Sequence, residues 1–519
     1  MESDGELQPF PEVKEILSEA EERFDRGRRT VGLFLGPLVL LALYFTPMPG
    51  LSHQAHALAA ILGGVVTYWV TEPIPIPITA VLGAVLCVLL GVAPVATAFA
   101  PFADPTVFLF LGSFILAEAM MAHGLDRRFA FSILSISWVG NSTARILLVY
   151  GGTAAFVSMW ISNTATTAMM FPIGLGIIHA VADMIKAQTG KDADPMKLRF
   201  GTGMMLMAAY AASVGGIGTP VGSPPNLIGI ALIEKSVGIK IPFFQWMLIS
   251  VPMLVVMFGV LATLMYFLHK PEVGRVQGGS EYVKREAAKL GKWTAGQRNA
   301  LIAFGVAVVL WVIPGFLAVL FGTDSPQAKA YNGAVPESAA ALIAASLLFV
   351  LPVDWKRREF TITWRQVTRI DWGTLLLFGG GLSLGKLMFD TKLAEAIGTG
   401  LLGLTGATEV WAMTFAAIVI SILISEATSN TASANMAVPV MIALAVAAGT
   451  NPLPPALGAT LGASWGFMLP VSTPPNAIVY GSGMVPITKM IRAGIVFDLC
   501  GAVLIWVGLR VMLPLMGLA

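Results

Sequence analysis

The segment ISNTATTAMMFPI at 161–173 places five small polar side chains, from Ser162 to Thr167, in an otherwise apolar region. A second segment, ATSNTASANMAVPV at 427–440, repeats the tripeptide Ser-Asn-Thr in an equally apolar setting, 267 residues further on. A lone Ser or Thr in an apolar helix usually bonds back to the preceding turn. A clustered and duplicated tripeptide instead indicates that the two positions share a function.

The sequence around these segments is that of an integral membrane protein. Of the 519 residues, 56% are hydrophobic and only 12% are charged, about half the usual charged fraction. Apolar stretches that approach the roughly 20 residues needed to cross a bilayer lie at 32–47, 55–71, 77–94, 106–122, 246–268, 300–321, 334–353, 373–389 and 493–517. The expected fold class is therefore an all-α polytopic membrane protein. The formal net charge of +2 indicates no nucleic-acid partner.

Clusters of lysine and arginine suggest how the chain is threaded, because such clusters face the cytoplasm. Of the 32 basic residues, 26 fall into six clusters: Lys14–Arg29, Arg127–Arg145, Lys186–Arg199, Lys270–Arg298, Lys356–Arg369, and Lys489 with Arg492. One threading places all six inside, with about eleven crossings from a cytoplasmic N-terminus to an external C-terminus. It requires re-entrant hairpins at 146–182 and 409–449, which return to the side from which they enter.

Further motifs recur in the same order in the two halves of the chain. FLFLGSF, with Gly112, and LLLFGGG, with Gly379, are again 267 residues apart, and GTPVGSPPN corresponds to LPVSTPPN at an offset of 250. In this threading the motifs of the first half enter the membrane from inside and those of the second half from outside. We therefore expect an inverted repeat of the kind found in secondary transporters. The expected organisation is a cytoplasmic N-terminal segment at 1–30, a first repeat at 31–269 with spans 1–6, a cytoplasmic linker at 270–298 and a second repeat at 299–519 with spans 7–11.

The duplicated motifs have the chemistry of an ion-binding site. The paired prolines at 224–225 and 474–475 stop a helix, and non-helical backbone at membrane depth occurs only where it is buried in protein or lines a wet cavity. Helix N-termini formed there would suit the carboxylates of an anion. Unwound carbonyls and Ser, Thr and Asn oxygens would suit a small hard cation such as sodium. The same tripeptide can serve both ligands.

Glu118, Glu426, Asp498 and His179 are ionisable groups within expected membrane segments, which makes each a candidate functional residue. Glu426 lies three residues before Ser429, and we expect it to hold the hairpin through hydrogen bonds. The sequence contains no HExxH, GxSxG, Walker or GxGxxG motif in a suitable context. We therefore do not expect an enzyme. The alternative hypothesis is an intramembrane enzyme that uses Glu118 or Glu426.

The chain from about residue 30 resembles the divalent anion:sodium symporter family, the INDY-type carriers of di- and tricarboxylates. The resemblance rests on MWISNTATTAMM, GTPVGSPPN, EATSNTASANM and LPVSTPPNAIV, together with TEPIPIPITA at 71–80. It implies a homodimer in the lipid bilayer. Each protomer would have a scaffold domain and a transport domain that moves as an elevator.

The resemblance also implies a set of site residues. The substrate carboxylates would be bound by Ser162, Asn163, Thr164, Ser223, Pro224, Ser429, Asn430, Thr431, Thr473 and Pro474. One sodium ion would be held around Ser158, Ser162, Asn163 and Gly222, and a second around Ser425, Thr428, Asn430 and Ser472. At positions 428 and 472 the ligands would be backbone carbonyls.

The function that follows is sodium-coupled import of C4-dicarboxylates such as succinate, malate or fumarate across the cytoplasmic (inner) membrane. No Lys, Arg or His lies within the four motifs, so a bound cation is needed to balance a dianion, and this favours symport. A sodium-independent dicarboxylate exchanger and a sulfate or citrate carrier of the same family are the alternatives. The last alternative is a more distant carrier with inverted repeats, such as a proton-coupled antiporter.

Overall fold

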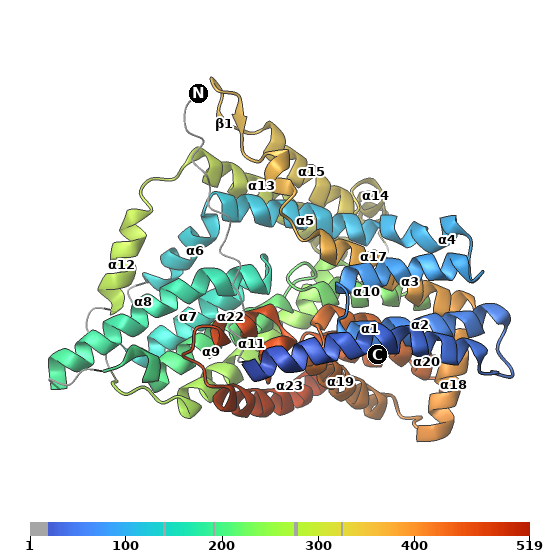
Figure 1. Cartoon of the computed structure of the whole chain (residues 1–519). Helices are drawn as coiled ribbons and strands as arrows, with labels where there is room; N and C mark the ends of the chain where they lie inside the picture. The colour runs from blue at the N-terminus through green and yellow to red at the C-terminus, as the bar shows by residue number, and fades with distance from the viewer. Residues whose placement is uncertain are drawn as a thin grey trace, which may run out of the picture.

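The computed structural model describes residues 19–136, 138, 142–189, 193–274, 279–322 and 325–518. These residues are almost entirely helical (Figure 1). The elements are α1 (Glu19–Phe45), α2 (His53–Thr71), α3 (Ile76–Leu89), α4 (Val95–Phe99), η1 (Ala100–Ala103), α5 (Pro105–Ala122), α6 (Leu125–Leu134), α7 (Thr143–Ser158), α8 (Asn163–Thr189), η2 (Pro195–Lys197), α9 (Arg199–Gly216), α10 (Pro224–Val237), α11 (Phe243–Leu268), α12 (Gly279–Lys289), α13 (Ala295–Phe321), α14 (Pro326–Ala334), α15 (Glu337–Val350), β1 (Pro352–Asp354), β2 (Glu359–Phe360), α16 (Trp364–Val367), α17 (Trp372–Asp390), α18 (Leu393–Thr405), α19 (Val410–Ala427), α20 (Asn430–Ala447), α21 (Leu453–Ala463), η3 (Pro470–Ser472), α22 (Pro474–Tyr480) and α23 (Ile487–Leu515).

Within the described residues, nine helices are long and apolar enough to cross a membrane, or ten when the bent pair α14 and α15 counts as one span. The expected class, an all-α polytopic membrane protein, is confirmed. The threading predicted from the basic clusters assigns its eleven crossings to α1, α2, α3, α5, α9 with α10, α11, α13, α14 with α15, α17, α21 with α22, and α23. The expected N-terminal segment at 1–30 lies largely outside the described residues, and α1 already includes residues 19–30.

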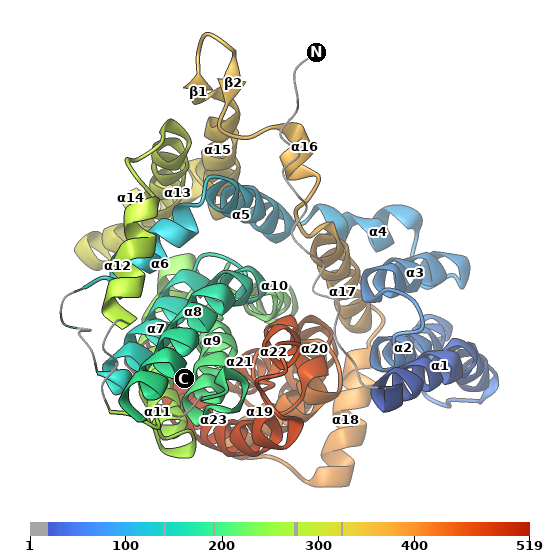
Figure 2. The same cartoon turned by 60° about the vertical axis from the view of Figure 1, so that its left-hand side comes forward.

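The helices form two groups, which are clearest in Figure 2. Helices α7–α11 and α19–α23 are gathered together, and we call them the inner bundle. Helices α1–α5 and α13–α18 lie along the outside of this group, and we call them the outer bundle. All four polar motifs lie in the inner bundle, and the outer bundle lies beside it without contributing these motifs.

Two hairpins in the inner bundle carry the Ser-Asn-Thr tripeptides. Helices α7 and α8 are joined by the residues 159–162, and the hydroxyl of Tyr150 on α7 donates to the carbonyl of Met170 on α8 at 2.8 Å. Helices α19 and α20 are joined by residues 428–429, and the hydroxyl of Ser433 on α20 donates to the carbonyl of Ser421 on α19 at 2.9 Å. In each case the hydrogen bond joins residues on opposite sides of the turn, so the two helices of each hairpin lie side by side.

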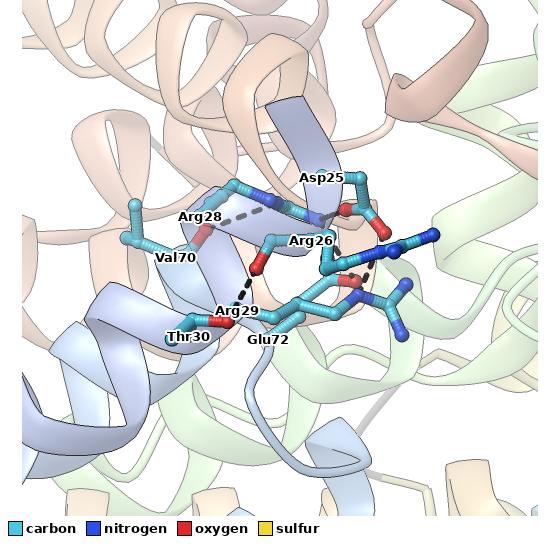
Figure 3. Close-up of polar contacts among 7 residues, drawn as sticks. All are labelled: Asp25, Arg26, Arg28, Arg29, Thr30, Val70 and Glu72. Atoms are coloured by element: carbon cyan, nitrogen blue, oxygen red, sulfur yellow. Dashed lines mark hydrogen bonds and ion pairs between the residues drawn. The ribbon is translucent and has the colours of Figure 1, made fainter. Parts of the chain in front are cut away.

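Helices α1 and α2 of the outer bundle are joined at one end by an arginine (Figure 3). The Arg28 guanidinium on α1 donates to the Val70 carbonyl in the last turn of α2 at 3.1 Å and lies 3.5 Å from the carboxylate of Glu72. Asp25, one turn away on α1, accepts from the same guanidinium at 2.8 Å. A positive charge stabilises the carbonyl end of a helix dipole, so Arg28 fixes the end of α2 against the start of α1.

The re-entrant threading predicted from the basic clusters can be tested by the sidedness of two exposed positions. Ala187, near the end of α8, and Asn451, after α20, are both exposed. In a background in which Cys87 and Cys500 are replaced by alanine, we expect a membrane-impermeant maleimide to label Ala187→Cys only from the cytoplasmic side. The same reagent should label Asn451→Cys only from outside. Labelling of both positions from one face would overturn the two-hairpin threading.

Candidate functional site

The tip of the first hairpin is closed by a hydrogen bond between two of the predicted site residues. Ser158 ends α7 and Asn163 begins α8, and the Ser158 hydroxyl donates to the Asn163 carboxamide oxygen at 2.7 Å. Ser162 lies just before α8, and its side-chain oxygen accepts from the amide of Ala165 at 3.2 Å, as an N-cap residue does. The tripeptide therefore starts a helix, and its polar groups lie where that helix leaves amides unpaired.

The second hairpin has the same arrangement at the same spacing. The Ser425 hydroxyl donates to the Asn430 carboxamide oxygen at 2.7 Å, and Ser429 caps α20 by accepting from the Ala432 amide at 3.2 Å. Each of these residues is 267 positions after its counterpart in the first hairpin. The Ser425 hydroxyl also contacts the Ala463 carbonyl at the end of α21, at 2.8 Å.

An asparagine braces each helix break. Between α9 and α10, the Asn226 amide nitrogen donates to the carbonyls of Gly216 and Thr219, both at 2.8 Å. Between α21 and α22, the Asn476 amide nitrogen donates to the carbonyls of Gly466 and Leu469 at 3.2 and 3.0 Å. The side-chain oxygens of both asparagines are buried without a hydrogen-bond partner among the described residues. The asparagine of each PPN motif thus donates to backbone carbonyls that the helix break leaves unpaired. Its own side-chain oxygen remains without a donor.

The two halves are packed into each other, which brings the four motifs together. Helix α10 of the first half packs against α20, and α22 of the second half packs against α8. The hydroxyls of Ser223, before α10, and Ser464, after α21, approach to 3.5 Å. Each broken helix therefore contacts the hairpin of the other half, and neither half forms the site alone.

Carbonyl oxygens converge beside the first hairpin tip. A Cβ atom on Gly222 would lie only 2.6–3.1 Å from the carbonyl oxygens of Gly216, Met159 and Ser158. A Cβ atom on Gly216 would overlap the Asn163 carboxamide. Both positions therefore require glycine, because a side chain would fill the space that these oxygens border. Such a set of oxygens, free of basic groups, fits a small hard cation.

The second break has a comparable arrangement. A Cβ atom on Gly466 would lie 3.1 Å from the Ser425 hydroxyl and 3.3 Å from the Ser472 side chain. The Thr428 hydroxyl donates to the Ile424 carbonyl at 3.0 Å. Thr428 is the C-cap residue of α19, and carbonyls at the end of a helix have no partner within it, so the backbone carbonyl of Thr428 can accept a ligand there.

The predicted site residues separate by exposure. The residues expected to bind only sodium are buried, and these are Ser158, Gly222, Ser425, Thr428 and Ser472. Most of the residues expected to contact substrate are at least partly exposed, and these are Ser162, Asn163, Thr164, Pro224, Ser429, Asn430, Thr431 and Pro474. Ser223 and Thr473, which precede the proline pairs, are buried. The polar groups therefore form an accessible layer over a buried one.

Glu426 organises the second break. Its side chain is 4% exposed, and its carboxylate accepts from the amides of Met468 and Leu469 at 2.7 and 3.2 Å and from the Ser472 hydroxyl at 2.5 Å. Asp498, on α23, is buried next to it.

His179, on α8, is exposed, unlike Glu426 and Asp498. Its Nδ1 contacts the Leu175 carbonyl at 2.8 Å, away from the four motifs.

Removing the Glu426 carboxylate should destabilise the protein. Glu426→Ala would leave the partly buried amides of Met468 and Leu469 without their acceptor and the buried Ser472 hydroxyl with only the Glu426 carbonyl, at 3.4 Å. An unsatisfied buried donor costs about 1–3 kcal/mol, so we expect loss of uptake together with a lower unfolding temperature. Glu426→Gln retains one acceptor oxygen and should be affected less. Glu395→Ala, at an exposed position on α18, is the control. Thermal unfolding in detergent measures the effect, and equal stability of Glu426→Ala and the control would contradict the bracing role.

Sequence reasoning missed several groups at the site. Thr219, whose hydroxyl donates to the Met159 carbonyl, ties the first break to the first hairpin. Ser464 and the carbonyls of Met159 and Gly216 also lie at the site. The position of Thr219 within the motif GTPVGSPPN is the signal that could have indicated its role. Backbone carbonyls carry no sequence signal.

Comparison with known proteins agrees with this geometry. The family model described as the transmembrane region of sodium:sulfate symporters matches residues 28–517. The sodium-dependent dicarboxylate transporter SdcS of Staphylococcus aureus strain USA300 is 33% identical over 501 residues, which cover 96% of this chain and 94% of that protein.

Two solved transporters share the fold. The YdaH transporter of Alcanivorax borkumensis has a TM-score of 0.53 and 12% sequence identity, covering 95% of this chain and 98% of that one. MtrF of Neisseria gonorrhoeae, an antimetabolite efflux pump, has a TM-score of 0.53 and 15% identity, with coverage of 93% and 97%.

The family and the relatives that this chain matches are membrane transporters and not enzymes, so the chain is a membrane transporter. The chain belongs to the divalent anion:sodium symporter family, as the family model and the identity with SdcS show.

Proposed function

We propose that the protein is a sodium-coupled importer of C4-dicarboxylates such as succinate, malate or fumarate. The observation that carries the proposal is the pair of hairpin tips, each with a Ser–Asn hydrogen bond of 2.7 Å beneath accessible polar residues. The 33% identity with SdcS, a sodium-dependent dicarboxylate transporter, supports the same substrate class.

In this proposal the accessible layer binds the substrate. The carboxylates lie between Ser162, Asn163 and Thr164 on one tip and Ser429, Asn430 and Thr431 on the other. The segments at Ser223-Pro224 and Thr473-Pro474 complete the pocket. Amides at the N-termini of α8 and α20 are oriented toward the substrate, where their partial positive charge favours an anion.

The buried layer holds two sodium ions. Ser158, Ser162, Asn163 and Gly222 form the first site, where three carbonyl oxygens converge. Ser425, Thr428, Asn430 and Ser472 form the second, to which Thr428 and Ser472 contribute backbone carbonyls at the ends of α19 and η3. Asn163 and Asn430 belong to both layers, so each can couple cation binding to substrate binding.

The inner bundle serves as the transport domain and the outer bundle as the scaffold of an elevator. Two copies would form a homodimer in the cytoplasmic membrane, with the N-terminus inside and the C-terminus outside. The inverted repeat at 31–269 and 299–519, joined by the linker at 270–298, is part of this proposal. It is supported by the paired geometries at offsets of 267 and 250.

Counterflow with labelled succinate in proteoliposomes tests the function. We expect uptake with sodium and little uptake with potassium or choline, and recovery of chemically unchanged succinate. Uptake driven equally well by preloaded dicarboxylate without sodium would instead indicate an exchanger. Competition by excess sulfate or citrate but not by malate or fumarate would indicate a different substrate class.

A further inference from the structure

Two carboxylates of the outer bundle contact the inner bundle on either side of the connection between α10 and α11. One is Asp104, the N-cap residue of α5, and the other is Glu337, the first residue of α15. Helices α5 and α15 pack against each other. The outer bundle therefore presents two acidic groups, from the starts of adjacent helices, to one short segment of the inner bundle.

The first contact is an ion pair. The Lys235 ammonium, in the last turn of α10, lies 2.8 Å from the second side-chain oxygen of Asp104. The Asp104 side chain is 5% exposed, whereas that of Lys235 is 47% exposed. The first side-chain oxygen of Asp104 caps α5 by accepting from the Thr106 amide at 2.9 Å. A buried carboxylate without its cation is expensive, so Asp104 strongly favours the arrangement in which Lys235 is present.

The second contact is a helix cap shared between the bundles. The backbone amide of Phe243, the first residue of α11, donates to a carboxylate oxygen of Glu337 at 2.7 Å. An amide at a helix N-terminus has no partner within its own helix, and a carboxylate there also interacts favourably with the helix dipole. Lys235 and Phe243 lie on either side of the α10–α11 connection, so the outer bundle holds this connection at both ends.

We propose that Asp104–Lys235 and Glu337–Phe243 form a latch that holds the inner bundle at one end of its travel and opens in every transport cycle. This inference rests on the elevator part of the proposed function. Helix α10 carries Lys235 and packs against α20 and α21, which belong to the site, whereas Asp104 belongs to the outer bundle. Movement of one bundle past the other by even one helical turn, about 5.4 Å, would separate both pairs of atoms.

The latch would control the rate of movement and leave binding largely unaffected. Its residues lie outside the four motifs, and Lys235 is nine residues after Asn226. Opening it exposes a buried carboxylate and a helix N-terminus at the same time. Lys235 and Asp104 are therefore positioning residues for the transport cycle. Their replacement should change the maximal rate of uptake more than the substrate concentration at half-maximal rate.

Cross-linking tests whether the contact must open. In a background with Cys87→Ala and Cys500→Ala, the pair Asp104→Cys and Lys235→Cys is treated with a short bis-methanethiosulfonate, and the linked fraction is measured by mass spectrometry. We expect at least about tenfold loss of sodium-driven succinate uptake in proportion to that fraction, with recovery after reduction. Uptake by fully linked protein at the unlinked rate, or failure of the pair to link, would overturn the latch. Absence of sodium-driven uptake by the parent with Cys87→Ala and Cys500→Ala alone would count against the proposed function instead.

Charge variants test whether the two residues act together. We expect Lys235→Met and Asp104→Asn each to change the maximal rate by about fivefold or more, with half-saturation within about twofold, because a pair in contact behaves as one unit. The Asn retains the cap on α5. The double variant should resemble either single variant, and Lys235→Arg should retain the normal rate. Lys386→Met is the control, because Lys386 pairs with Asp390 within α17 and this ion pair need not open. Multiplying effects in the double variant, or an equal effect of the control, would overturn the proposal.

Discussion

Replacing either Asn163 or Asn430 by alanine should abolish succinate uptake while the protein remains folded. Each carboxamide accepts a hydrogen bond at 2.7 Å from a buried serine and lies at the start of a hairpin helix. In the proposed site each is shared between a carboxylate and a sodium ion. Loss of two interactions with charged groups, at about 1.5–3 kcal/mol each, corresponds to roughly a hundredfold loss or more.

The measurement is initial uptake of labelled succinate into proteoliposomes at matched protein content. Asn299→Ala provides the matched control, because Asn299 is a hydrogen-bonded asparagine on α13 of the outer bundle, where its amide donates to the Pro352 carbonyl at 2.9 Å. Size-exclusion profiles and thermal unfolding show whether each variant is folded. Near-normal uptake by either hairpin variant would place the substrate somewhere other than between the two tips.

Sodium should raise the apparent affinity for succinate by about tenfold or more. A dicarboxylate brings two negative charges to motifs that contain no Lys, Arg or His. The N-termini of α8 and α20 supply about half an elementary charge each, which leaves roughly one negative charge to be balanced by bound cations. By linkage, succinate must raise the affinity for sodium by the same factor. A tenfold change corresponds to about 1.4 kcal/mol of coupling.

Protection of a cysteine near Ser429 from alkylation measures this coupling. Succinate should protect it in sodium buffer, and potassium should substitute poorly because it is the larger ion in a cage of Ser, Asn and carbonyl oxygens. Titrating each ligand at fixed concentrations of the other gives both sides of the linkage. Equal protection in sodium, potassium and choline, together with uptake driven by preloaded dicarboxylate, would replace the symporter with the exchanger.

Local patterns predicted much of this structure, because membrane helices and their interruptions are encoded by contiguous residues. The proline pair at 224–225 begins α10 and the pair at 474–475 begins α22. The contacts of Ser158 with Asn163 and of Ser425 with Asn430 lie within single hairpins, five residues apart. The bracing role expected for Glu426 is present in its hydrogen bonds to the second break.

Contacts between distant segments could not be predicted in this way. Nothing in the period or composition of α8 indicates that α22 packs against it, and the pairing of Asp104 with Lys235 joins residues 131 positions apart. The short helices α6 and α18 and the charged helix α12 were also missed, because they lack a long apolar stretch. These elements depend on where the larger helices place them.

The two helix breaks are fastened unequally, although their motifs correspond. At the first, all the ties are neutral: the Thr219 hydroxyl donates to the Met159 carbonyl, and Trp246 and Ser250 on α11 donate to the carbonyls of Ile217 and Gly218. At the second, the position that corresponds to Met159 is Glu426, whose carboxylate accepts three hydrogen bonds, and bonds to a charged acceptor are about twice as strong. Residues 217–222 of the first break are all buried, whereas residues 468–471 of the second are partly or fully exposed. The charged tie therefore lies at the break that is more open to solvent. Removing the Glu426 carboxylate should speed deuterium exchange at the amides of Met468 and Leu469, which donate to it, and leave exchange at 217–222 unchanged.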